Sequence, residues 1–150
     1  IAGLNDRAVK GARGTIIQTD LLLAESIGEF DACILPGGMP GALNLADSAD
    51  VRELLVSMHA LNKMIAAICA APAIVLTPLG ILDNKTATCF PDMTDKFNPS
   101  TSVSDAPVVV DGNIITSRSA GTAMEFALTI AEKLAGKEKR DAVARAILVE

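Results

Sequence analysis

The chain has 150 residues, half of them hydrophobic and only 3% aromatic, with a formal net charge of −5 and a pI near 4.8. This length fits a single domain that buries one sizeable core. The acidic balance argues against a nucleic-acid partner, because phosphate binding needs clustered Lys and Arg. No apolar stretch reaches the roughly 20 residues that span a bilayer, so no membrane partner is expected.

The three cysteines are odd in number, far apart and unlike any zinc-binding spacing. No secretory signal is visible at the start of the sequence. We therefore expect free thiols in a reducing, cytoplasmic compartment, with no metal and no cofactor.

Hydrophobic periodicity and turn residues predict the secondary structure in chain order. The predicted elements are a strand end at 1–5, a strand at 13–17, a helix at 21–26 capped by Asp20 and stopped by Gly28, a strand at 31–35, a helix at 48–61, a strand at 64–68, a helix at 73–79, strands at 85–88, 106–110 and 113–116 with a turn at 111–112, a long helix at 122–136 and a shorter helix from about 139. Strands alternating with helices predict an α/β fold, in which a largely parallel sheet carries helices on both faces.

One cysteine stands at the junction of a predicted strand and a predicted helix. Cys69 directly follows the apolar strand at 64–68, and alanines flank it on both sides. This is the sequence form of a nucleophile elbow, a turn so sharp that its neighbours must be small. The elbow presents the side chain at the carboxyl end of the sheet, beside a helix N-terminus that favours a thiolate. We predict that Cys69 is the catalytic residue.

A second motif also ends a buried strand. Pro36 is followed by Gly37 and Gly38, and two glycines let backbone N–H groups approach a bound group closely. Together with the N–H of Ala70, they are predicted to form an oxyanion hole.

The remaining candidates have simpler alternatives. We interpret Cys33 as a small hydrophobic residue of its strand and Cys89 as a structural or surface thiol. Arg118 and the amides of the segment 117–122 either bind an anion near the site or form a helix cap with a surface salt bridge.

Three stretches carry a family resemblance: FDACILPGGMPGA at 30–42, MIAAICAAP at 64–72 and DGNIITSRSAGT at 111–122. They resemble the ThiJ/PfpI superfamily, and most closely its branch of parkinsonism-associated, DJ-one-like deglycases. The resemblance implies one flavodoxin-like three-layer sandwich over residues 1–150, paired as a homodimer. By position, Cys69 matches the family nucleophile, and Gly38 and Ala70 match its backbone donors.

The resemblance also implies a function. Members are described as glyoxalases acting on methylglyoxal-like 2-oxoaldehydes, as deglycases of glycated substrates, and as proteins that protect against carbonyl and oxidative stress. The alternative is a non-enzymatic redox sensor or chaperone that acts through oxidation of Cys69. A peptidase or glutamine amidotransferase is disfavoured, because the one histidine, His59, is predicted near the opposite edge of the sheet from Cys69.

Relatives also have an internal N-terminal strand, and a glutamate from the segment after it lies beside the cysteine. This chain begins after both features. We expect the missing strand to be supplied as a separate chain, as a cleaved but retained segment, or by a partner. We expect it to bring a Glu or Asp to Cys69.

Overall fold

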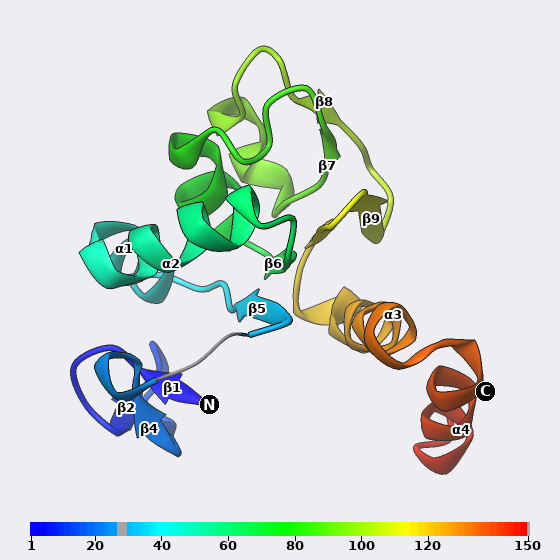
Figure 1. The fold of residues 1–150 in the computed structure, drawn as a ribbon, viewed down its shortest axis with the longest axis horizontal. Coiled ribbons are helices and arrows are strands. Elements are labelled where there is room, and N and C mark those ends of the chain that lie inside the picture. Colours follow the sequence, from blue (N-terminus) through cyan, green and yellow to red (C-terminus); the bar gives the residue numbers. More distant parts are fainter. Residues whose placement is uncertain (27–29, 150) are drawn as a thin grey trace.

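The computed structural model describes residues 1–26 and 30–149, and Figure 1 shows its elements. The strands are β1 (Ala2–Gly3), β2 (Ala8–Lys10), β3 (Ile16–Gln18), β4 (Leu21–Leu22), β5 (Ala32–Leu35), β6 (Met64–Ile68), β7 (Thr86–Ala87), β8 (Ser102–Val103), β9 (Val108–Asp111) and β10 (Ile114–Ser117). The helices are α1 (Gly41–Asp47), α2 (Ala49–Ala60), α3 (Ala123–Ala135) and α4 (Lys137–Ala146), joined by a π-helix at Pro72–Leu76 and by 3₁₀ helices at Leu23–Glu25, Thr77–Leu79, Pro91–Lys96 and Ala120–Thr122.

The central sheet has the strand order β5-β6-β10-β9. Strands β5, β6 and β10 are parallel, and only β9 runs antiparallel. The predicted, largely parallel sheet is therefore confirmed. Leu35 of β5 pairs with Ala67 of β6, so the two strands end side by side and the loops that follow them meet at one edge.

Apolar side chains pack on both faces of this sheet, as the three-layer prediction requires. On one face Ile65, Ala67 and Ile114 pack with α2 and the π-helix. On the other face Ala66 and Ile115 contact α3. The alternation along β6 follows from the two-residue period of a strand. Figure 1 shows α1 and α2 on one side of β6 and α3 on the other.

The hairpin between β9 and β10 turns one residue later than predicted. Asp111 pairs with Ile114, which leaves Gly112 and Asn113 as the two turn residues. Gly112 has a φ of +64°, a left-handed value that glycine adopts without steric cost. The carboxylate of Asp111 does not contribute to the turn; it accepts a hydrogen bond from the amide of Thr86 on β7 at 2.8 Å.

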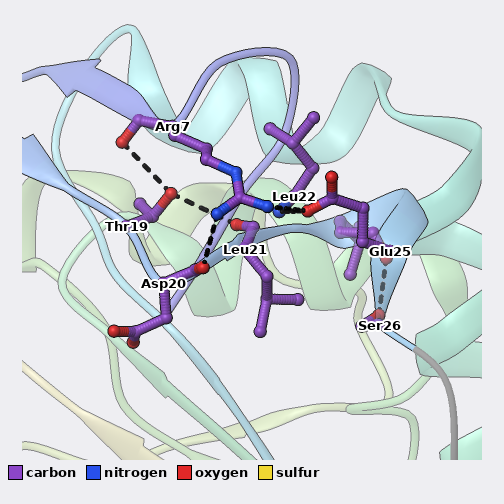
Figure 2. A network of polar contacts seen from close by, with 8 residues as sticks. Arg7, Thr19, Asp20, Leu21, Leu22, Glu25 and Ser26 are labelled. Carbon is purple, nitrogen blue, oxygen red and sulfur yellow. Dashed lines mark hydrogen bonds and ion pairs between the residues drawn. The ribbon is translucent and has the colours of Figure 1, made fainter.

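The helix predicted at 21–26 is wrong. Leu21 and Leu22 form β4, which pairs in parallel with β1, and only a short 3₁₀ helix follows. Figure 2 shows the polar contacts of this segment: the Glu25 carboxylate accepts hydrogen bonds from the Leu22 amide at 2.8 Å and from Arg7 at 2.7 Å. Arg7 also donates to the carbonyl oxygen of Asp20 at 2.9 Å. The predicted stop, Gly28, lies outside the described residues.

Several smaller differences concern short elements. The helix predicted at 73–79 is a π-helix followed by a 3₁₀ turn, and the last helix begins directly after Gly136. The sequence did not predict helix α1, strand β8 or the β2–β3 hairpin. The three strands are short and exposed, and α1 has only seven residues. Among the described residues, no helix has the length and apolar character needed to cross a membrane.

Candidate active site around Cys69

Cys69 occupies a sharp turn between β6 and the π-helix. Its φ is +64°, in the left-handed region that non-glycine residues rarely adopt. The turn is held from both sides: the Cys69 amide donates to the Ser117 carbonyl at 2.9 Å, and its carbonyl accepts from the Phe90 amide at 2.8 Å. A strained backbone fixed by surrounding hydrogen bonds is typical of functional sites. The side chain is half-buried.

Gly37 packs directly against this turn. A methyl group placed on Gly37 would lie 2.6 Å from Cβ of Cys69, 2.6 Å from the Ile68 carbonyl oxygen and 2.9 Å from the Ala70 nitrogen. Real Cβ atoms do not approach so closely, so only glycine permits this contact. The next residue, Gly38, has a φ of +85°, and its carbonyl accepts from the amide of Ala42 at 2.8 Å.

The predicted amide donors are free. Within the described part of the chain, the amides of Gly37, Gly38 and Ala70 donate no hydrogen bond. The structure thus brings Gly37 and Ala70 against Cys69, with Gly38 next in the chain. Free N–H groups beside a nucleophile stabilise negative charge that develops on a bound oxygen.

The other two thiols lie in different surroundings. Burial raises the pKa of the Cys33 thiol to about 11. Burial also raises the pKa of Cys89 to about 11, with smaller contributions from the nearby charges of Asp95 and Cys69, while Arg118 acts in the opposite direction. Cys89 is only 1% exposed, and its Sγ contacts the Phe90 carbonyl oxygen at 3.3 Å.

Arg118 directly follows Ser117, whose carbonyl binds the Cys69 amide, but its guanidinium binds Asp105. Its guanidinium donates to the Asp105 carbonyl at 3.0 Å and lies 4.0 Å from the Asp105 carboxylate. His59 is exposed in the last turn of α2, where the chain turns back towards the start of β6, away from Cys69. Among the described residues, no three His, Cys, Asp or Glu side chains gather where they could hold a metal ion.

Sequence reasoning missed two supports of the turn. Ser117 acts through its carbonyl and Phe90 through its amide, which every residue type except proline provides, so their identities carry almost no signal of this role. The Ser117 hydroxyl is fully buried and bonds to the Pro107 carbonyl at 3.0 Å and to the Thr122 hydroxyl at 2.7 Å.

Comparison with known proteins identifies the family of this chain. The profile of the DJ-1/PfpI family matches residues 1–133. The chain is 47% identical over 152 residues to protein dj-1beta of Drosophila melanogaster, covering 99% of this chain and 81% of that protein. Its fold matches the crystal structure of Drosophila melanogaster DJ-1beta with a TM-score of 0.93 at 45% identity, covering 98% of this chain and 80% of that one.

Two further relatives are less similar to this chain in sequence. The chain is 38% identical over 144 residues to the glutathione-independent glyoxalase DJR-1.2 of Caenorhabditis elegans, covering 95% of this chain and 76% of that protein. It is 41% identical over 146 residues to the DJ-1 homolog A of Arabidopsis thaliana, covering 97% of this chain but only 37% of that protein.

The close contact at Gly37 yields a stability prediction. Replacing Gly37 with alanine should lower the free energy of unfolding by about 1–3 kcal/mol, the usual cost of forcing extra atoms into a packed site. Urea unfolding followed by circular dichroism measures this change. Gly41→Ala is the matched control, because a methyl group at Gly41 meets nothing within 4 Å. Equal stability of the two variants would show that the contact is absent.

The raised pKa values predict how thiol reactivity depends on pH. At pH 8, three units below a pKa of about 11, roughly one in a thousand Cys33 or Cys89 side chains is a thiolate. Iodoacetamide at pH 8 should therefore alkylate Cys69 first, and the other two should react only as the pH rises towards 11. Peptide mass spectrometry identifies the modified cysteine, and the urea-unfolded chain, in which all three should react, is the control. Labelling of Cys33 or Cys89 ahead of Cys69 would contradict the assignment.

Proposed function

The chain belongs to the DJ-1/PfpI family, and from that premise we propose that it is a cysteine-dependent glyoxalase acting on methylglyoxal-like 2-oxoaldehydes. The observation that carries the proposal is the strained turn at Cys69, with the free amides of Gly37 and Ala70 beside it. The name of the Caenorhabditis elegans relative, a glutathione-independent glyoxalase, supports the same reaction class.

The proposed reaction needs no external oxidant or reductant. The Cys69 thiolate adds to the aldehyde carbon, and the new oxyanion accepts hydrogen bonds from the free amides. A base then moves the proton of that carbon to the neighbouring keto carbon through an enediolate, which leaves a thioester. Water cleaves the thioester and releases the hydroxy acid and the thiol. The aldehyde carbon is oxidised, the keto carbon is reduced, and water is the only addition.

The same site chemistry extends to glycated substrates. In the adduct, the aldehyde carbon of methylglyoxal is bonded to a protein amine or thiol. The Cys69 thiolate would displace that group: the S–C bond to Cys69 forms, the bond to the protein group breaks, and the amine or thiol leaves with a proton, which is a deglycase reaction. Either activity removes reactive carbonyls, and we propose a protective role in carbonyl and oxidative stress on this ground.

Oxidation of Cys69 is the second candidate function. The free amides can hold the oxygens of a sulfenate or sulfinate as well as they hold a substrate oxyanion. No histidine stands near Cys69 to serve as a base, since His59 is exposed at the far end of α2. The redox sensor uses the same sulfur without turnover, so kinetics distinguish it from the enzyme.

Turnover of methylglyoxal tests the proposal directly. We expect the protein to form lactate without glutathione, with EDTA present, and Cys69→Ala to reduce the rate to the uncatalysed value. Enzymatic lactate determination gives the rate. His59→Gln is the control variant and should retain full activity, because its side chain lies far from the thiol. Absence of turnover, combined with ready oxidation of Cys69 by mild peroxide, would favour the redox sensor instead.

We also propose that the protein forms a two-fold symmetric homodimer, as the resemblance implies. The described chain exposes large apolar side chains on its last two helices, including Leu134 at 51% and Val143 at 37%. Sedimentation velocity at micromolar concentration should show a dimer of the 15.5 kDa chain. A stable monomer under these conditions would contradict this proposal.

A further inference from the structure

Two of the three cysteines are neighbours in space, although they are 20 positions apart in the sequence. The amide of Phe90 donates to the carbonyl of Cys69 at 2.8 Å, and Cys89 is the residue directly before Phe90. The carbonyl of Phe90 accepts from the Cys89 thiol, whose Sγ lies 3.3 Å from it. Phe90 therefore contacts both cysteines, one through its amide and the other through its carbonyl.

Strand β10 holds both segments in this arrangement. The Cys69 amide donates to the carbonyl of Ser117 at 2.9 Å, and the Thr88 amide donates to the hydroxyl of Thr116 at 3.0 Å. Thr116 and Ser117 are consecutive, buried residues at the end of β10. Cys69 and the residue before Cys89 are thus fixed to adjacent positions of one strand.

The spacing of the two cysteines suits a disulfide bond. The peptide unit between Cys89 and Phe90 is the hydrogen-bond donor, and the carbonyl of Cys69 itself is the acceptor. Standard peptide geometry around such a hydrogen bond places the two Cα atoms roughly 5–6 Å apart. Disulfides join Cα atoms about 4.4–6.8 Å apart. Cys33 lies elsewhere, since it pairs with Ile65, four residues before Cys69 along β6, a separation of about 13 Å.

The two thiols also differ in access to solvent. Cys69 is half-buried, whereas Cys89 is 1% exposed. An oxidant dissolved in water therefore meets Cys69 first. Burial and the charge of Asp95 raise the pKa of Cys89 to about 11, and the charge of Cys69 adds to them, which agrees with two neighbouring thiols. A disulfide carries no charge, so it avoids the cost of burying a thiolate at this position.

We propose that Cys89 is a resolving cysteine for Cys69, and that the two form a reversible intramolecular disulfide after a hydroperoxide has oxidised Cys69. The proposal rests on the thiol reactivity proposed above for Cys69, but not on the glyoxalase reaction. Its consequence is protection of the site, because thiols reduce a disulfide, whereas a sulfinic acid is not reduced by them.

The proposed reaction has two steps. The Cys69 thiolate attacks the peroxide: an S–O bond forms, the O–O bond breaks, and water leaves, so that Cys69 becomes a sulfenic acid. The Cys89 thiolate then attacks the sulfur of Cys69: the S–S bond forms, the S–O bond breaks, and hydroxide leaves and is protonated to water. One peroxide is reduced to two waters while two thiols become one disulfide. An external dithiol restores both thiols by exchange.

Peptide mapping without reductant tests the proposal. Trypsin cleaves after Lys63, Lys85 and Lys96, so Cys69 and Cys89 fall in the separate peptides 64–85 and 86–96. After treatment with one equivalent of hydrogen peroxide, we expect these two peptides to be linked and to separate on addition of dithiothreitol. Oxidation of Cys69 without this link would overturn the proposal, as would a link from Cys69 to Cys33.

Matched variants show what the second thiol does. In Cys89→Ser, and in Cys89→Ala if the serine variant folds poorly, peroxide should produce at least fivefold more sulfinic acid on Cys69 than in the unsubstituted protein. Cys33→Ser is the control and should form the disulfide normally. Equal sulfinic acid in all variants would overturn this proposal alone. Failure of Cys69 to oxidise in every variant would overturn the thiol reactivity proposed for it as well.

The pH dependence of the second step identifies the attacking group. The charged groups that act on Cys89 are Asp95, Cys69 and Arg118, and their sum with burial leaves its pKa at about 11. Below that pKa the thiolate fraction rises tenfold with each pH unit, so disulfide formation should be about tenfold faster at pH 8 than at pH 7. Acid quenching after a pulse of peroxide times the loss of the Cys69 thiol and the appearance of the disulfide separately. Equal rates of the second step at both pH values would overturn attack by the Cys89 thiolate.

Discussion

Strands β5 and β6 end side by side, and the loop that leaves β5 packs at Gly37 against the turn that leaves β6. The candidate site depends on this contact between the two loops. Gly37 fits against the turn at Cys69 because it has no side chain, and the turn itself requires a strained φ of +64°. The contact places Gly37 against Cys69 and Ala70, and the amides of Gly37 and Ala70 donate no hydrogen bond within the described part of the chain. Packing between two loops thus sets which backbone groups lie beside Cys69.

The three cysteines lie in different surroundings, although all share the same side chain. Cys33 lies on β5 and Cys89 follows β7, and for both the cost of placing a thiolate in apolar surroundings dominates. Cys69 stands instead where a strand ends and the backbone turns. Strand β5 also contributes Cys33, Ile34 and Leu35 to the lining of an apolar cavity of about 630 Å³, and its end leads into Gly37.

Local sequence was sufficient to predict the central sheet and the position of Cys69, because apolar strands, small residues and glycines mark them within a few positions. Non-local pairing explains the main failure: Leu21 and Leu22 have helical propensity, but they pair with β1 almost twenty residues earlier. The hairpin at Gly112 shifted by one residue because turn residues fix a turn more loosely than strand pairing does. The roles of Ser117 and Phe90 could not be predicted, since main-chain contacts carry no residue signature.

A crystal structure of the protein carrying an oxygen-bearing adduct on Cys69, prepared with mild peroxide or with methylglyoxal, tests the central claim most directly. The account predicts that an adduct oxygen lies about 2.7–3.1 Å from the amide nitrogens of Ala70 and of Gly37 or Gly38, the distance expected for oxyanion-hole donors. An adduct oxygen that points to solvent, with those amides bound to water, would contradict it.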